Sequence, residues 1–138
     1  MRYLAIDYGA RRTGLAVSDA DEKIASPLAV LDGQKNLIER IAAIVKEQNV
    51  DAVVVGLPLN MDGSQGFQAK RVLNFAGGLK NRLNISLYYQ DERLSSFDAD
   101  EKLSAAQFTK KEKLKRRDAV AAARILQDFL EQKREKSD

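Results

Sequence analysis

Hydrophobic residues follow a strand-like spacing in the first part of the chain and a mixed spacing after about residue 34. Residues 2–8, 13–18 and 24–31 are short apolar segments separated by turns, a pattern typical of antiparallel strands. Pro27 lies within the third segment and has no backbone N–H group, so this strand is expected at the edge of a sheet. The first part of the chain therefore predicts a three-stranded antiparallel meander.

The second part of the chain alternates between helical and strand-like patterns. Apolar residues recur at helical spacing in three segments, at about 34–48, 72–83 and 111–133. A continuous apolar run at 51–59 indicates a strand covered on both faces, and a further strand is predicted at 85–92. A short helix is expected to start within 95–98, where serine is a suitable N-cap.

The predicted elements specify an α/β fold with one mixed five-stranded sheet. Three antiparallel strands are followed by two parallel strands, and helices flank the sheet. A chain of 138 residues fits one domain, so 1–138 is expected to form a single unit, with a frayed, charged tail at 134–138. Ligands of open α/β sheets bind at the carboxyl ends of parallel strands, so functional residues are expected there.

Composition limits the available chemistry. The chain contains no cysteine and no histidine, which excludes zinc sites built from these residues, thiol nucleophiles and Ser-His-Asp triads. A chain without disulfides is expected in the reducing cytoplasm. No apolar run approaches the roughly 20 residues of a membrane helix, so no membrane partner is expected. The net charge of +3 permits a nucleic-acid partner without requiring one.

Three carboxylates occupy positions where apolar residues would be expected. Asp7 ends the first strand, and Glu92 ends the last predicted strand. If these strands are parallel, both side chains emerge at the same edge of the sheet. Asp118 lies in the apolar stripe of the last helix, between Leu114 and Ala122 at a spacing of four residues. An acid in such a stripe is expected to have a partner.

A divalent cation would explain all three acids. Carboxylates that converge on one place cannot all ionise unless a positive charge compensates them. Oxygen ligands without His or Cys suit Mg²⁺ or Mn²⁺, and two such ions can assist phosphodiester cleavage. Each acid also has a simpler interpretation: Asp7 could open the turn at Gly9, Glu92 could pair with Arg93, and Asp118 could pair with a lysine or arginine from the sheet.

Basic residues lie near each acid in the sequence, which suits a polyanion laid across a metal site. Residues 110–117 are the densest basic run, and Lys111 and Lys115 share one face of the predicted helix. The candidate nucleic-acid-binding residues are Arg11, Arg12, Asn60, Arg93, Lys111 and Lys115. Solvated helix charges and a plain turn at Asn60 remain the alternatives. No aromatic residue interleaves the basic run, so a base-stacking platform is not indicated there.

Four stretches, AIDYGARRTGLAVSD, VVGLPLNMDGS, DERLSS and DAVAAARILQDFL, together resemble the YqgF family, also called RuvX. This family comprises Holliday junction resolvase-like proteins and pre-16S ribosomal RNA nucleases. The resemblance implies a ribonuclease H-like fold, a cytoplasmic bacterial protein and a metal-dependent nuclease with Asp7, Glu92 and Asp118 as its catalytic acids. It also implies maturation of the 5′ end of pre-16S rRNA, with junction resolution suggested for relatives. Ala10 and Arg117 depart from the family pattern.

Two other functions remain open at this point. The stretch DYGARRTG also resembles the phosphate turn of actin-like and sugar-kinase-like ATP-binding proteins, but these need two lobes, and Ala10 lacks the hydroxyl group that such a turn often uses. The second alternative is a non-catalytic RNA-binding or scaffold domain of the same fold. Pre-rRNA and branched DNA are both possible substrates, and both a monomer and a homodimer remain open, although junction cleavage would favour a symmetric dimer.

Overall fold

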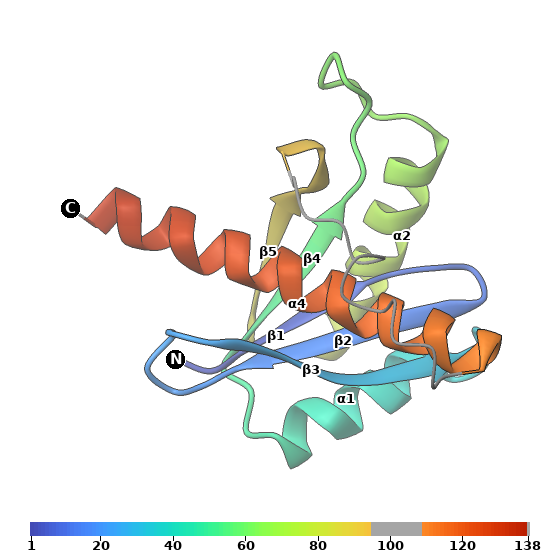
Figure 1. The fold of residues 1–138 in the computed structure, drawn as a ribbon, viewed down its shortest axis with the longest axis horizontal. Helices are drawn as coiled ribbons and strands as arrows, with labels where there is room; N and C mark the ends of the chain where they lie inside the picture. The colour runs from blue at the N-terminus through green and yellow to red at the C-terminus, as the bar shows by residue number, and fades with distance from the viewer. Residues whose placement is uncertain (95–108, 138) are drawn as a thin grey trace.

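The computed structural model describes residues 1–94 and 109–137 (Figure 1). Its strands are β1 (Tyr3–Asp7), β2 (Arg12–Ser18), β3 (Ala25–Asp32), β4 (Ala52–Leu57) and β5 (Ser86–Asp91). Its helices are α1 (Leu37–Glu47), α2 (Phe67–Arg82), the short 3₁₀-helix η1 (Glu92–Leu94) and α4 (Lys110–Ser137).

The five strands form one sheet in the order β3-β2-β1-β4-β5. β2 pairs antiparallel with both β1 and β3, whereas β4 pairs parallel with both β1 and β5. The predicted mixed sheet is therefore confirmed, and β3, which contains Pro27, lies at an edge as expected. The carboxyl ends of β1, β4 and β5 meet at one edge of the sheet because these strands are parallel.

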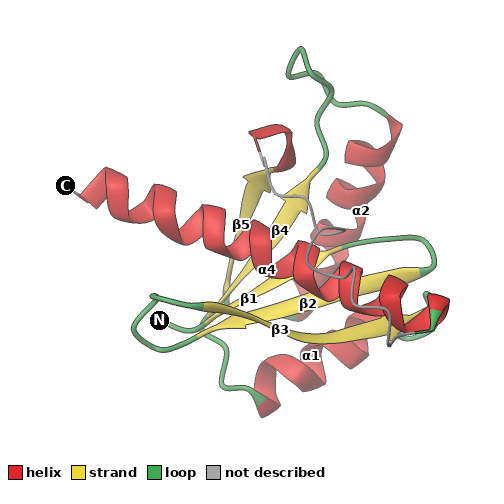
Figure 2. Cartoon of the chain, in the orientation of Figure 1, coloured by secondary structure: helices red, strands yellow, loops and turns green. Residues whose placement is uncertain are grey.

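Helices cover both faces of the sheet (Figure 2). Alternate residues of β1 point to opposite faces, so Leu4 and Ile6 pack with α1 and α2, whereas Tyr3 and Ala5 pack against α4. Helix α4 crosses the sheet and contacts all five strands. By the same alternation Asp7, which follows Ala5 by two positions, belongs to the face that α4 covers.

Gly14 allows α4 to approach the sheet closely. A Cβ atom at this position of β2 would lie 2.1 Å from the backbone oxygen of Asp118, which is far inside contact distance. The missing side chain therefore lets the helix backbone rest directly on the strand. This contact fixes the position of the Asp118 backbone relative to β1 and β2.

The element boundaries differ from the sequence prediction in two places. Helix α2 begins at Phe67, before the apolar spacing that starts at Val72, and α4 continues to Ser137 although fraying was expected from residue 134. The short helix expected at 95–98 lies outside the described residues. Among the helices described, none combines the length and apolar character required to span a membrane.

Replacing Gly14 with alanine should destabilise the protein by roughly 1–3 kcal/mol, because the added methyl group would overlap the α4 backbone. The measurement is the free energy of unfolding from urea denaturation. Gly77→Ala is the matched control: it lies inside α2, where an added Cβ meets no atom within 4 Å. Because alanine is the better helix former, that variant should gain about 0.5–1 kcal/mol. Equal stabilities of the two variants would contradict the close contact at Gly14.

Candidate active site at the strand ends

Two of the three candidate acids lie at the carboxyl edge of the parallel strands. Asp7 is the last residue of β1, and Glu92 follows directly after β5. Strand β4 lies between these strands in the sheet. The two acids therefore come to the same edge from strands that are not adjacent, as expected if the first and last strands run parallel.

Gly56 of β4 provides the space in which the two carboxyl groups meet. It pairs with Gln90 of β5, and a Cβ atom at Gly56 would lie 3.1 Å from both Cδ and Oε1 of Glu92. The same atom would lie 2.6 Å from Cδ1 of Ile125 in α4. A side chain at this position would therefore displace the Glu92 carboxyl group or the helix residue above it.

Asp7 and Glu92 share a hydrogen bond, and both carboxyl groups have raised pKa values. Burial raises the pKa of Asp7 to about 6, and the negative charge of Asp118 adds to this shift, while the hydrogen bond with Glu92 opposes it. Burial also raises the pKa of Glu92 to about 7, with further contributions from Asp7 and Asp91. The two groups therefore hold a proton between them to a higher pH than isolated carboxyl groups would.

Asp118 is close enough to influence Asp7, but its carboxylate has another partner. The Arg12 Nε atom lies 2.6 Å from Asp118 Oδ2, and both side chains are about one quarter exposed. Within residues 1–94 and 109–137, no group of three acidic side chains is arranged to hold a metal ion. The structure thus brings two of the three predicted acids together, and an arginine from the sheet holds the third, while the metal-binding and catalytic roles of all three stay predictions.

Arg11 and the two candidate lysines come from two parts of the chain, the turn before β2 and the first turns of α4. Arg11 is exposed on the turn between β1 and β2. Lys115 pairs with Asp32 at 3.1 Å. The backbone of Lys111 lies in the first turn of α4, and its side chain is outside the described set.

Arg93 and Asn60 hold the loop between β4 and α2 in place. The Arg93 guanidinium pairs with Asp91 at 2.8 Å and donates a hydrogen bond to the Met61 carbonyl oxygen at 3.1 Å. The expected pairing of Glu92 with Arg93 is therefore replaced by pairing of Asp91 with Arg93. The Asn60 amide donates to Ser64 Oγ at 2.9 Å, within the same loop.

Gly56 is the site residue that the sequence reasoning missed. A glycine inside an otherwise apolar strand signals a bulge or a close approach by another group, and this signal is present in the run AVVVGL. The partner of Asp118 was foreseen only as some basic residue from the sheet. That general expectation is confirmed by Arg12.

Comparison with known families identifies the chain. Residues 1–132 match the family model RuvX, described as "Holliday junction resolvase". The chain belongs to the RuvX family. The family resemblance expected from the four sequence stretches is thereby confirmed.

Relatives of this RuvX chain carry the name "Putative pre-16S rRNA nuclease". One, from Chloroflexus aurantiacus, is 43% identical over 134 residues, covering 95% of this chain and 87% of the relative. Another, from Maridesulfovibrio salexigens, is 35% identical over 132 residues, covering 94% and 98%.

Solved structures with the same architecture include nucleic-acid complexes. The RuvC protein of T. thermophilus in complex with a Holliday junction substrate matches with a TM-score of 0.59 and 17% identity, over 96% of this chain and 95% of that one. The fowlpox virus resolvase bound to Holliday junction DNA matches with a TM-score of 0.57 and 15% identity, over 96% and 98%. The ribonuclease H-like fold of this RuvX chain is thereby confirmed.

The raised pKa values predict an unusual stability profile for Asp7→Asn in the presence of a chelator. The folded-state pKa of Asp7, about 6, lies above its ordinary value of 3.8, so ionisation destabilises the fold progressively as the pH rises from about 4 to 7. Asparagine does not ionise. At pH 8 the variant should therefore be more stable than the wild type by roughly 1–3 kcal/mol, and this difference should vanish near pH 4. Chemical denaturation over this pH range measures the effect.

Asp19→Asn is a control for which the opposite change in folding stability is expected. The pKa of Asp19 is lowered, chiefly because its carboxylate accepts a hydrogen bond from the Ile24 backbone and also one from Lys23. Loss of this carboxylate should destabilise the protein above pH 4, where Asp19 is ionised. If Asp7→Asn were less stable than the wild type at pH 8, the buried carboxyl pair would not be the source of repulsion.

Proposed function

We propose that this RuvX chain is a divalent-metal-dependent nuclease that hydrolyses phosphodiester bonds during 5′-end maturation of pre-16S rRNA. The observation that carries the proposal is the pair formed by Asp7 and Glu92, half-buried at the strand-end edge and unfavourable as two carboxylates. The names of the relatives support the choice of reaction and substrate.

The donor set fits a hard divalent cation. Asp7 and Glu92 supply carboxylate oxygens from strand ends, and their mutual repulsion is a condition that a cation would relieve. A bound Mg²⁺ or Mn²⁺ would supply Lewis-acid activation of water and of the phosphodiester group. Strands β1, β4 and β5 keep the ligands in place, and Gly56 keeps the space between them open.

Asp118 would complete the ligand set by a side-chain rotation. Its backbone is fixed against Gly14, so only the side chain can exchange partners. The carboxylate would leave Arg12 and turn toward Asp7. The released guanidinium would then be available to a substrate phosphate, together with Arg11 on the same turn.

A cleavage panel tests the proposed activity. The substrates are a pre-16S leader RNA, an unrelated single-stranded RNA and a four-way DNA junction, each with Mn²⁺ or Mg²⁺. We expect metal-dependent cleavage of the leader RNA by the wild type and a loss of at least 100-fold in rate for Asp7→Asn, because one ligand charge is gone.

The panel also separates the alternatives. Preferential cleavage of the four-way junction would indicate that the substrate is branched DNA. Binding of the leader RNA without cleavage under any metal condition would indicate the non-catalytic RNA-binding or scaffold domain. Undiminished cleavage by Asp7→Asn would remove Asp7 from the active site.

Arg12→Gln tests the role assigned to the Arg12–Asp118 pair. Arginine and the cation compete for Asp118, so removing the guanidinium should tighten Mn²⁺ binding by roughly three- to tenfold, as measured by calorimetry without nucleic acid. Arg11→Gln is the matched control, because it removes the same charge from the neighbouring exposed position. Equal Mn²⁺ affinities in the two variants would show that the cation does not use Asp118.

A further inference from the structure

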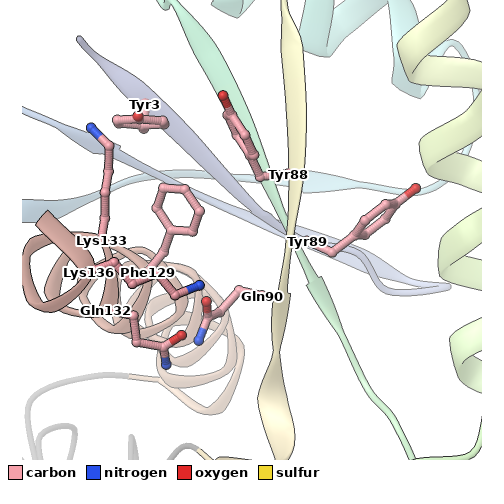
Figure 3. Close-up of a pocket in the computed structure, with 8 residues that line it drawn as sticks. All are labelled: Tyr3, Tyr88, Tyr89, Gln90, Phe129, Gln132, Lys133 and Lys136. Atoms are coloured by element: carbon pink, nitrogen blue, oxygen red, sulfur yellow. The ribbon is translucent and has the colours of Figure 1, made fainter.

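A pocket lies on the α4 side of the sheet, between the edge strand β5 and the C-terminal half of α4 (Figure 3). Its volume is about 260 Å³. Residues that line it include Tyr88, Gln90, Phe129, Gln132, Lys133 and Lys136. This volume is below the range of about 300–1,000 Å³ that is usual for drug-sized ligands, so it suits a smaller group.

One wall of the pocket is aromatic. Tyr88 is 41% exposed, although its ring lies 5.6 Å from that of Phe129. Phe129 in turn packs edge-on against buried Tyr3 at 5.2 Å, which fixes its orientation. A partly open tyrosine ring on a rigid aromatic base is a stacking surface for a flat ring.

A second wall offers hydrogen-bonding groups. Gln90 is only 5% exposed, and it lines the pocket from β5. A side-chain amide both donates and accepts hydrogen bonds, so this position favours a ligand that supplies both kinds of group. Gln132 lines the same pocket from α4 and presents a second amide.

The pocket adjoins the candidate active site along one strand. Tyr88 and Gln90 project from β5 toward α4, whereas Tyr89 projects to the other side of the strand (Figure 3). Glu92 continues the same alternation just beyond β5. At a rise of about 3.3 Å per residue, Gln90 lies about 7 Å and Tyr88 about 13 Å along the strand from Glu92.

The mouth of the pocket is basic. Lys133 lies over the Tyr3 ring at 5.4 Å and also pairs with Glu22, so its position is fixed. Lys136 lies one turn closer to the C-terminus and is exposed. An anionic backbone could pass over these ammonium groups while a base enters the pocket.

We propose that this pocket binds one unpaired base of single-stranded RNA, next to the nucleotide whose phosphodiester bond is cleaved. The base stacks on Tyr88, its polar edge meets the Gln90 and Gln132 amides, and the adjoining phosphate lies near Lys136. The inference rests on the proposed nuclease function, because it places the pocket on the path of the substrate strand. It also assigns the base-stacking surface to β5 and α4, away from the basic run at 110–117.

The test uses short single-stranded RNA that contains 2-aminopurine, whose fluorescence falls when the base stacks. The measurements are made with a chelator present, so that no cleavage is needed for a signal. Wild-type protein should quench the probe on binding. Tyr88→Leu should abolish the quenching and weaken binding by roughly 5- to 150-fold, the range expected for the loss of one base–aromatic stack.

Two further variants separate the pocket from general effects. Phe67→Leu is the matched control, because Phe67 is 77% exposed at the start of α2 and does not line the pocket. It should keep both quenching and affinity. Gln90→Leu should reduce the difference in affinity between adenine and uracil oligonucleotides while leaving the salt dependence unchanged, because phosphate contacts carry no base information.

The outcomes distinguish failure of the base-binding proposal from failure of the proposed nuclease function. Binding and metal-dependent cleavage by the wild type, with Tyr88→Leu indistinguishable from Phe67→Leu, would overturn the pocket and leave the nuclease function intact. Quenching that depends on Tyr88, in a protein that cleaves no substrate, would support the pocket and remove the nuclease function. Absence of RNA binding, or occupation of the groove by a second copy of the chain in solution, would overturn the pocket.

Discussion

The contact between the α4 backbone and strand β2 at Gly14 determines where the candidate functional side chains lie. Because the helix rests on the strand without an intervening side chain, Asp118 reaches the end of β1, where it raises the pKa of Asp7. The same helix then continues across β4 and β5. Ile125 therefore lies above Gly56, and Phe129 and Gln132 line the pocket beside Tyr88. One helix thus links the acidic edge to the aromatic pocket.

Glycine also determines what the acidic edge can do. Asp7 and Glu92 come from strands that are not adjacent, and Gly56 on the intervening strand leaves room for the Glu92 carboxyl group. Burial and like charge then make full ionisation unfavourable. A rigid sheet holds the pair in this arrangement, which is the kind of preorganisation that a cation site requires.

Much of this arrangement could be predicted from the sequence because it depends on strong local patterns. The change from strand to helical spacing predicted the mixed sheet, and the position of each acid at a strand end predicted the edge where Asp7 and Glu92 meet. The start of α2 was missed because Gly66 provides no side-chain cap and the first turn of this helix carries few apolar residues. The partner of Asp118 could not be specified, since Arg12 is 106 positions away and a rotamer decides the contact.

The attachment of Arg93 to the loop between β4 and α2 bears on how members of this family can diverge. Surface loops generally tolerate insertions and deletions well. Here the guanidinium joins Asp91 to the Met61 carbonyl oxygen, and its Nη1 atom lies 3.3 Å from the position that a Cβ of Gly63 would occupy. Gly63 itself has a φ of +89°, which side-chain-bearing residues rarely adopt. A change in loop length would therefore shift the residue next to Glu92, so this loop should evolve by substitution at exposed positions rather than by changes in length.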